Sequence, residues 1–182
     1  MSSTIQIHRT AICLFVLLLL SGCGPSGPTW QTFHDAKAGF SVDFPGKVES
    51  PPGEFKDDGG PGRFHYFSSP GNGYGYDVSV IVQSRTPEQI ERLLKDNESH
   101  PWRENDKEAT FDTTRIKQGD IAGVEAVGRI DKPDHKTFKR WQTYSSPTAD
   151  YYVSVESAKF SDPYHADVEK FFKSFKIDAA KP

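Results

Sequence analysis

The sequence predicts an α+β fold in which an antiparallel β-sheet is flanked by two main helices. Along most of the chain apolar residues alternate with polar ones, which is the two-residue period of a half-buried strand. Two later segments instead space their apolar residues three and four apart, as on one face of a helix. Two such helices and an antiparallel sheet bury their apolar faces only when the helices cover the sheet.

The expected strands before the first helix are separated by turn-forming residues, which are frequent in a chain with 15 Gly and 13 Pro. A first strand is expected after Trp30, and a second over 40–44, where three apolar residues alternate with two polar ones. Residues 49–62 are rich in Gly, Pro and Asp and predict a long loop. Two further strands are expected over 63–69 and 76–82.

A helix is expected to begin at 86–89, where the sequence TPEQ matches a capping box with proline at the first helical position. Ile90, Leu93 and Leu94 then form an apolar stripe with the spacing of a helix. Docking of this stripe on the sheet is the simpler interpretation, and a face for a partner protein is the alternative.

Two hairpins and a second helix complete the expected order. The hairpins join 109–117 to 121–130 and 137–144 to 151–156. Residues 161–163 are expected to open the last helix, with Asp162 as its N-cap. Its predicted apolar face consists of Tyr164, Val168, Phe171, Phe172 and Phe175.

The N-terminal segment has the build of a secretory signal, with Arg9 before ten unbroken apolar residues at 11–20. Ten helical residues rise about 15 Å, half of a roughly 30 Å hydrocarbon core, so they do not form a stable transmembrane span. The sequence Leu20-Ser21-Gly22-Cys23 that follows resembles the bacterial lipobox. This predicts a signal peptide over 1–22 and a diacylglyceryl group on the Cys23 sulfur. The alternative is an ordinary cleaved signal that happens to precede a cysteine.

The cysteine count supports lipidation. Cys13 lies in the apolar run that is discarded, so Cys23 is the only cysteine of the mature chain and no internal disulfide forms. Each buried methylene contributes about 0.8 kcal/mol, so two or three acyl chains hold a protein to a leaflet. The expected partner is therefore a membrane, reached through the lipid on Cys23. In enteric bacteria an Asp after this cysteine resembles a signal for retention in the inner membrane. Gly24 therefore favours the outer membrane.

The expected organisation is a lipidated cysteine and flexible tether over 23–29, a single α+β domain over 30–178 and a disordered tail over 179–182. With 22 Lys+Arg against 25 Asp+Glu the net charge is −3. This balance does not suggest nucleic-acid binding, which requires a clustered basic surface. The predicted location is the periplasm-facing side of a cell membrane.

The order of these elements resembles the PsbP/Mog superfamily, in which an antiparallel sheet lies between helices. Five segments carry the resemblance: GFSVDFPGKV (39–48), YDVSVIV (76–82), GVEAVGRI (123–130), YYVSVES (151–157) and VEKFFKSFKI (168–177). Similar bodies occur in many bacterial lipoproteins without an assigned activity. Better-known relatives bind photosystem II or a small GTPase, so the resemblance implies a binding role. Their partner-contact residues have no matching motif in this sequence.

No catalytic signature is found in the sequence, and no cofactor is expected. The best cluster of metal-ligating residue types is Asp131, Asp134 and His135, and a solvated hairpin turn is its simpler interpretation. Asp162 and His165, with Asp167, form a second cluster, which the start of a helix also explains. Three tryptophans are candidates for stacking on sugars but fit core or rim packing better: Trp30, Trp102 and Trp141.

The sequence therefore favours a membrane-anchored envelope protein that binds a protein or small ligand, or assists assembly, without catalysis. The alternative is a lipid-anchored, metal-dependent hydrolase that uses the Asp131/His135 or the Asp162/His165 neighbourhood. A purely structural envelope protein is a third hypothesis. Convergence of the acidic and histidine residues in one deep pocket would favour the enzyme, and scattered exposed positions would favour the binding protein.

Overall fold

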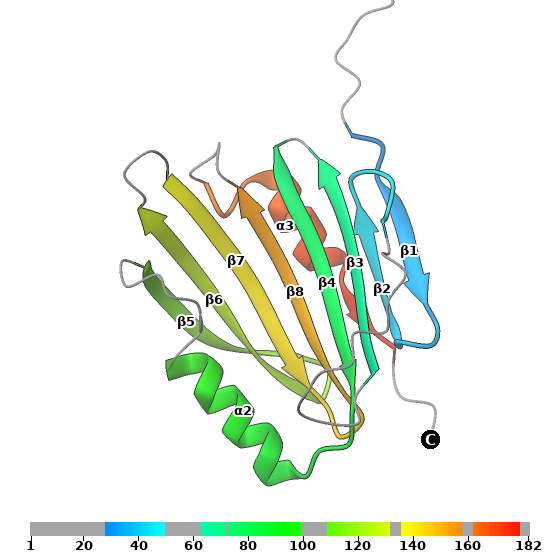
Figure 1. The fold of residues 1–182 in the computed structure, drawn as a ribbon, viewed down its shortest axis with the longest axis vertical. Coiled ribbons are helices and arrows are strands. Elements are labelled where there is room, and N and C mark those ends of the chain that lie inside the picture. The colour runs from blue at the N-terminus through cyan, green and yellow to red at the C-terminus, as the bar shows by residue number, and fades with distance from the viewer. Residues whose placement is uncertain are drawn as a thin grey trace, which may run out of the picture.

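A computed structural model describes residues 28–49, 63–71, 73–99, 109–131, 136–157 and 162–178. The elements follow one another in this order: β1 (Gln31–Asp35), β2 (Phe40–Phe44), β3 (Arg63–Gly71), β4 (Tyr74–Val82), α2 (Pro87–Ser99), β5 (Ala109–Gln118), β6 (Ile121–Asp131), β7 (Lys136–Ser145), β8 (Ala149–Ser157), α3 (Ala166–Ser174) and β9 (Lys176–Ile177). The predicted α+β fold with antiparallel strands and two main helices is confirmed (Figure 1).

The strands form two sheets. Six of them form a long antiparallel sheet in the order β3-β4-β8-β7-β6-β5. The first two strands leave this sheet and pair with the last one, in the order β1-β2-β9. Strand alternation alone does not reveal this division, because a strand has the same two-residue period in either sheet. The strand β9 was missed because two residues are too few to show a two-residue period.

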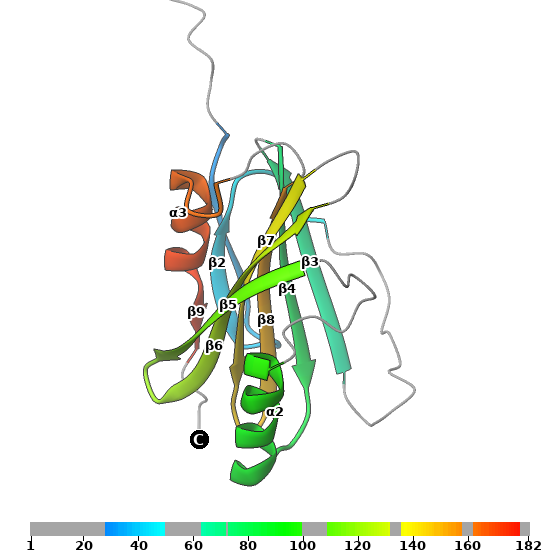
Figure 2. The same ribbon diagram turned by 90° about the vertical axis from the view of Figure 1, so that its left-hand side faces the viewer.

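The two helices cover opposite faces of the long sheet. Arg115 of β5 forms ion pairs with α2. In the strand register Arg115 lies opposite Val124 of β6, and Val124 lies opposite Thr143 of β7. Arg140 of β7 bonds α3. Thr143 and Arg140 are three residues apart on one strand and therefore point to opposite faces. Figure 2 shows α3, β2 and β9 together on one side of the long sheet.

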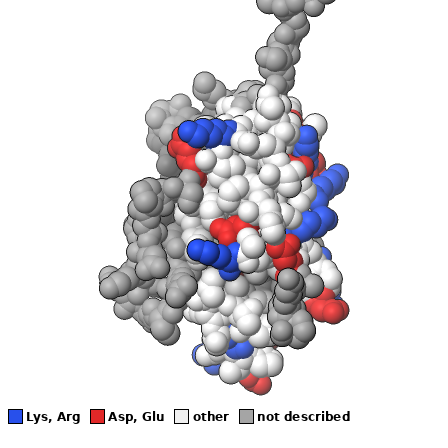
Figure 3. Space-filling view, turned by 90° about the vertical axis from the view of Figure 1, so that its right-hand side faces the viewer, with Lys and Arg blue, Asp and Glu red and all other residues white. Residues whose placement is uncertain are grey.

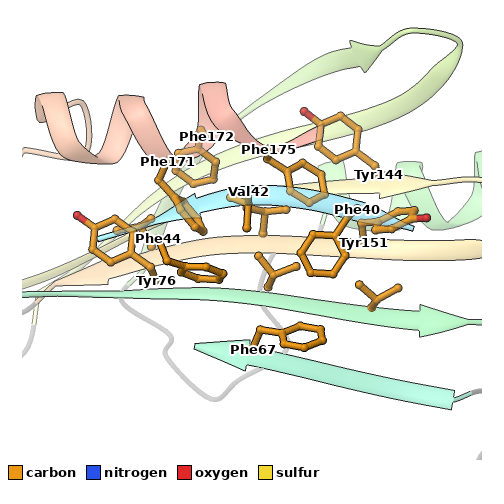
Figure 4. Packing of buried hydrophobic residues seen from close by; sticks show 14 of the residues in the cluster. Phe40, Val42, Phe44, Phe67, Tyr76, Tyr144, Tyr151, Phe171, Phe172 and Phe175 are labelled. Atoms are coloured by element: carbon orange, nitrogen blue, oxygen red, sulfur yellow. The ribbon is translucent and has the colours of Figure 1, made fainter. Parts of the chain in front are cut away.

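The main core lies between the long sheet and the layer that α3 and the three-stranded sheet form on it. It is rich in aromatic residues, which pack mostly edge-on or tilted at 4.9–6.2 Å between ring centroids, while Tyr144 and Phe175 are stacked. Figure 4 shows Phe40, Phe44 and Phe175 between the strands and α3. A smaller apolar group lies on the other face: Leu94, Val124, Ala126 and Trp141.

The capping box of α2 is confirmed. The Thr86 amide donates to Gln89 Oε1 at 2.8 Å, and the Gln89 amide donates to Thr86 Oγ1 at 3.3 Å. Of the predicted stripe only Leu94 is fully buried, and α2 makes its main contacts with β6 and β7. Docking on the sheet is therefore the correct interpretation for this residue.

The start of α3 differs from the prediction. The N-cap is His165, whose Nδ1 accepts from the Asp167 amide at 3.3 Å, and the helix begins at Ala166. Asp162 instead accepts from the Tyr164 amide at 2.9 Å in a turn that precedes the helix. Tyr164 was predicted on the buried face of the helix, but it lies outside the helix and is 58% exposed. The other four residues of the predicted face are buried.

The molecule has two distinct ends. Residue 28 enters at the end where β4 and α3 begin, called here the proximal end (Figure 1). The opposite, distal end holds the β1–β2 turn, the β7–β8 turn, the end of β4 and Asp178 (Figure 1). At about 3.3 Å per residue, β4 separates the two ends by about 26 Å. In the described part of the chain, no helix is both long and apolar enough to cross a membrane.

Candidate functional site

A cavity of about 480 Å³ opens at the distal end of the molecule. This size lies within the range of about 300–1,000 Å³ that is typical of small-molecule sites. Its walls come from distant parts of the chain: His34, the turn at 36–39, Val82, residues 148–149, Tyr151 and Asp178. We call it the distal pocket.

The turn between β1 and β2 forms one wall of the distal pocket. Asp35 Oδ1 accepts hydrogen bonds from the amides of Lys37, at 2.8 Å, and Ala38, at 3.0 Å. Such an Asp-initiated turn satisfies backbone donors without a strand partner. Gly39 closes it with φ +71°, a conformation that disfavours residues with a Cβ. The Gly39 amide donates to the Asp35 carbonyl at 2.8 Å, and Lys37 is left at the exposed crest.

The facing wall, at residues 148–149, is held in place by a buried carboxylate. Asp150 is fully buried and accepts from Arg85 Nε at 2.7 Å, from Gln83 Nε2 at 2.6 Å and from the Ser145 hydroxyl. The Gln83 amide also donates to the Thr148 carbonyl at 3.0 Å. Several charge-assisted bonds to one buried group fix its surroundings, so this wall is preorganised.

The charged groups of the distal pocket have opposite signs. His34 Nε2 lies 3.0 Å from Asp178 Oδ2, and both side chains are partly exposed. The second carboxylate oxygen of Asp178 has no hydrogen-bond partner among the described residues. Lys37 forms no ion pair within the described part of the chain either. Figure 3 shows charges of both signs interspersed on the side of the molecule that carries β1 and β2.

The floor of the distal pocket is less polar. Ala38 and Ala149 are buried, and Val82 is partly buried. The ring of Tyr151 packs edge-on against Phe175 at 6.2 Å between centroids. Burial, followed by the negative charge of Asp178, raises the pKa of the Tyr151 hydroxyl, so this group stays neutral and can donate a hydrogen bond.

The residues singled out in the sequence do not come together at the distal pocket. Cys23, Asp134 and His135 lie outside the described residues, and Asp131 ends β6. Asp162, His165 and Asp167 lie at the proximal end, where they form the turn and cap that start α3. Within the described ranges, no group of three His, Cys, Asp or Glu side chains is placed to hold a metal ion.

Two of the three tryptophans have packing roles. Trp30 meets the Tyr76 ring edge-on at 6.1 Å, and Lys170 Nζ lies 4.3 Å from the centre of the indole. Trp141 is buried and meets Phe111 edge-on at 5.4 Å. These contacts agree with core and rim packing, and Trp102 lies outside the described residues.

Sequence reasoning missed the distal pocket entirely. One local signal was readable: the sequence DAKAG at 35–39 has an Asp followed by a Gly at the spacing of a tight turn. The partners of this turn are not readable, because His34 and Asp178 are 144 positions apart.

Comparisons with known proteins support the fold alone. No protein-family profile matches the chain, and no curated protein matches it in sequence. A solved structure from Bacteroides thetaiotaomicron matches 84% of this chain with a TM-score of 0.51 and 14% identity. The chain spans about half of that protein, 50% of its length.

Two further solved structures are more distant. A Pseudomonas aeruginosa protein of unknown function matches with a TM-score of 0.41 and 11% identity, over 78% of this chain and 91% of its own. LpqN of Mycobacterium tuberculosis, described as involved in cell envelope biogenesis, matches with a TM-score of 0.42 and 9% identity. That match covers 85% of this chain and 82% of LpqN. The resemblance to the PsbP/Mog superfamily stays a prediction.

Proposed function

We propose that this chain is a non-catalytic binding protein of the bacterial envelope, held to a membrane by lipid on Cys23 and binding its ligand in the distal pocket. The observation that carries the proposal is the placement of this pocket. It opens at the end of the molecule opposite residues 28–30, through which the body connects to the lipobox cysteine (Figure 1). A protein fixed to a surface at one end presents its opposite end to the surrounding compartment.

The tether sets the working distance. Residues 24–28 consist of Gly, Pro and Ser alone, and five residues span roughly 10–15 Å. With the length of β4 added, the distal pocket lies about 40 Å from the lipid at full extension. At full extension the distal pocket therefore reaches the periplasm beyond the headgroups.

The lining of the distal pocket supports binding in preference to catalysis. Its titratable groups are His34, Lys37, Tyr151 and Asp178, and the one close pair among them, His34 and Asp178, is joined directly. Among the described lining residues, no nucleophile is joined to a base, the usual core of a hydrolytic site. The metal-dependent hydrolase is the rival proposal, and metal content measured on the purified protein tests it. Stoichiometric metal with chelator-sensitive hydrolysis would favour the rival.

The anchor is tested by replacing the lipobox cysteine. Cys23→Ala removes the only sulfur that the mature chain offers for lipid, so we expect the protein to move from the membrane fraction to the soluble fraction. Mass spectrometry of the mature N-terminal peptide should show a diacylglyceryl group on Cys23 of the wild type.

Cys13→Ala is the matched control, since it removes a sulfur from the discarded apolar run and should leave both the fraction and the lipid unchanged. An unmodified Cys23 in mature wild-type protein that is freely soluble would contradict the anchor.

A further inference from the structure

We propose that the ligand of the distal pocket is a small zwitterion: a molecule with a free ammonium group and a free carboxylate on a short aliphatic frame, such as a dipeptide. This inference rests on the proposed binding function and adds the chemical class of the ligand. It follows from the sign, placement and partners of the charges that line the pocket.

The distal pocket carries one positive and one negative side chain that a ligand can meet. Lys37 contributes a positive charge that no described residue neutralises, and Asp178 contributes a negative charge at the same cavity. A ligand with only negative groups is repelled by Asp178, and one with only positive groups is repelled by Lys37. A ligand that carries one charge of each sign meets an opposite charge at both ends.

The carboxylate of Asp178 also has unused hydrogen-bond acceptor positions. An ionised carboxylate has about four acceptor positions on its two oxygens. His34 Nε2 occupies one of them on Oδ2, at 3.0 Å, and the Asp178 amide is bonded to the Gly39 carbonyl at 2.9 Å, which fixes the backbone beneath it. Oδ1 is therefore positioned and available to accept from an ammonium group, which brings three donors.

The walls of the distal pocket fit a short aliphatic molecule. The residues between the charged groups are small: Ala36, Ala38, Gly39 and Ala149 leave the space that larger side chains would fill. Val82 and the Tyr151 ring supply apolar contact at the floor. A short aliphatic frame matches this lining, and the neutral Tyr151 and Thr148 hydroxyls can bond the peptide group of a dipeptide.

A divalent cation is the strongest rival occupant by chemistry, and the donors argue against it. Among the described residues that line the distal pocket, His34 and Asp178 are the only imidazole and carboxylate side chains, and a stable site needs three or more protein ligands. A lone anion such as phosphate has Lys37 and His34 as donors but meets the Asp178 carboxylate beside them.

The test uses the dipeptide alanyl-valine in three forms, titrated calorimetrically into the full-length protein solubilised in detergent. We expect the free dipeptide to bind. The N-acetyl form lacks the ammonium and the C-terminal amide lacks the carboxylate. Each should bind at least about tenfold more weakly, because each loses one charge-assisted contact.

Paired variants assign each end of the ligand to its residue. In Asp178→Asn the N-acetyl and free forms should bind alike, whereas Lys37→Gln should remove the preference for the free form over the amide. This is the logic of a double-mutant cycle between protein and ligand. Lys117→Gln and Asp120→Asn make the same chemical changes at exposed positions outside the pocket, and they should keep both preferences.

Equal binding of all three forms, or binding of none of them, overturns the zwitterion. Thermal unfolding of each variant near the wild-type temperature shows that the fold is intact. The lipid anchor is tested separately, by fractionation of the Cys23 variant. A negative result for the ligand class therefore does not count against the proposed location. A ligand that binds elsewhere is recognised by its indifference to both pocket variants.

Discussion

At the scale of single residues, the most unusual environment belongs to a carboxylate on the sheet face away from the main core. Asp77 of β4 accepts a hydrogen bond from the Tyr66 hydroxyl on the neighbouring strand β3. Burial raises the pKa of Asp77 from its ordinary 3.8, while the Tyr66 hydrogen bond and the charge of Lys139 oppose that rise. Burial and then Asp77 raise the pKa of Tyr66 to about 12.

Replacing Tyr66 with Phe should raise the pKa of Asp77 further, because the hydrogen bond that favours its charged form is lost. A raised folded pKa means that the folded state holds its proton more tightly than the unfolded chain. The free energy of unfolding therefore falls as pH rises from 3.8 through the folded pKa, and Tyr66→Phe should steepen this fall. At pH 7 we expect a loss of about 1 kcal/mol, the usual net contribution of a hydrogen bond, because Asp77 is only partly buried.

Titration of the Asp77 carboxyl by NMR and urea unfolding at several pH values check this result. Tyr164→Phe removes the same hydroxyl from an exposed ring and is the control. An unchanged or lower Asp77 pKa in Tyr66→Phe would show that the hydroxyl does not support the carboxylate.

At the scale of elements, α3 is fastened to the sheet by one arginine as well as by its apolar face. Arg140 of β7 is 6% exposed and bonds both Glu125, at 2.9 Å, and Glu169 of α3. Its guanidinium lies 4.7 Å from the centre of the Phe172 ring and 4.9 Å from that of Tyr164. The exposed position of Tyr164 thus has a structural reason, since its ring covers the guanidinium.

Glu169→Gln should weaken this attachment in a pH-dependent way. Burial raises the pKa of Glu169, but the contacts from Arg140 and Lys173 outweigh burial and bring it below the ordinary 4.5. A lowered folded pKa gives stability that is present above pH 4.5 and is lost as pH falls through the folded pKa. We expect the variant to lose about 1–3 kcal/mol at pH 7 and less at acidic pH.

Urea unfolding of Glu169→Gln at neutral and acidic pH measures the difference. Glu156→Gln, which removes a half-exposed carboxylate 3.9 Å from Lys139, should change stability little at either pH. A loss for Glu169→Gln that is the same at both pH values would show that its charge is not the cause.

The helices and hairpins show which features local sequence can predict. The capping box of α2 and both hairpins follow from residues within a few positions of one another, and the sequence predicted them closely. The start of α3 was misplaced because Asp162, a good N-cap by type, bonds the Tyr164 amide in a turn, and His165 takes the capping role. Residue type alone does not choose between two neighbouring acceptors.

At the scale of the whole molecule, a side-chain amide links the two sheets in addition to the core. Gln118, the last residue of β5, donates from Nε2 to the Phe175 carbonyl at 2.8 Å and accepts from the Ile177 amide. It thereby stands in for a strand neighbour that the two-residue β9 lacks on this side. Such long-range contacts, like the one between His34 and Asp178, have no signal in local periodicity. For this reason the longer elements were predicted from the sequence, whereas β9, the second sheet and the distal pocket were not.

Gln118→Ala should loosen β9 without unfolding the long sheet. The Phe175 carbonyl and the Ile177 amide lose their partner, so we expect faster hydrogen exchange at Ile177 while the amides of β4 and β8 keep their protection. Lys117→Ala, which truncates the neighbouring exposed side chain, is the control. An Ile177 amide that exchanges equally slowly in both variants would show that other contacts hold β9.

The register of β1 also decides how the protein bears tension. All five residues of β1 pair with β2, from Gln31 opposite Phe44 to Asp35 opposite Phe40. A pull between the tethered end and the far tip acts along these strands, so the five pairs resist it in shear at the same moment. A pull across the strands would break them one after another, as a zipper opens. If the body is anchored through Cys23 as proposed, a load on its distal end therefore acts along these five pairs.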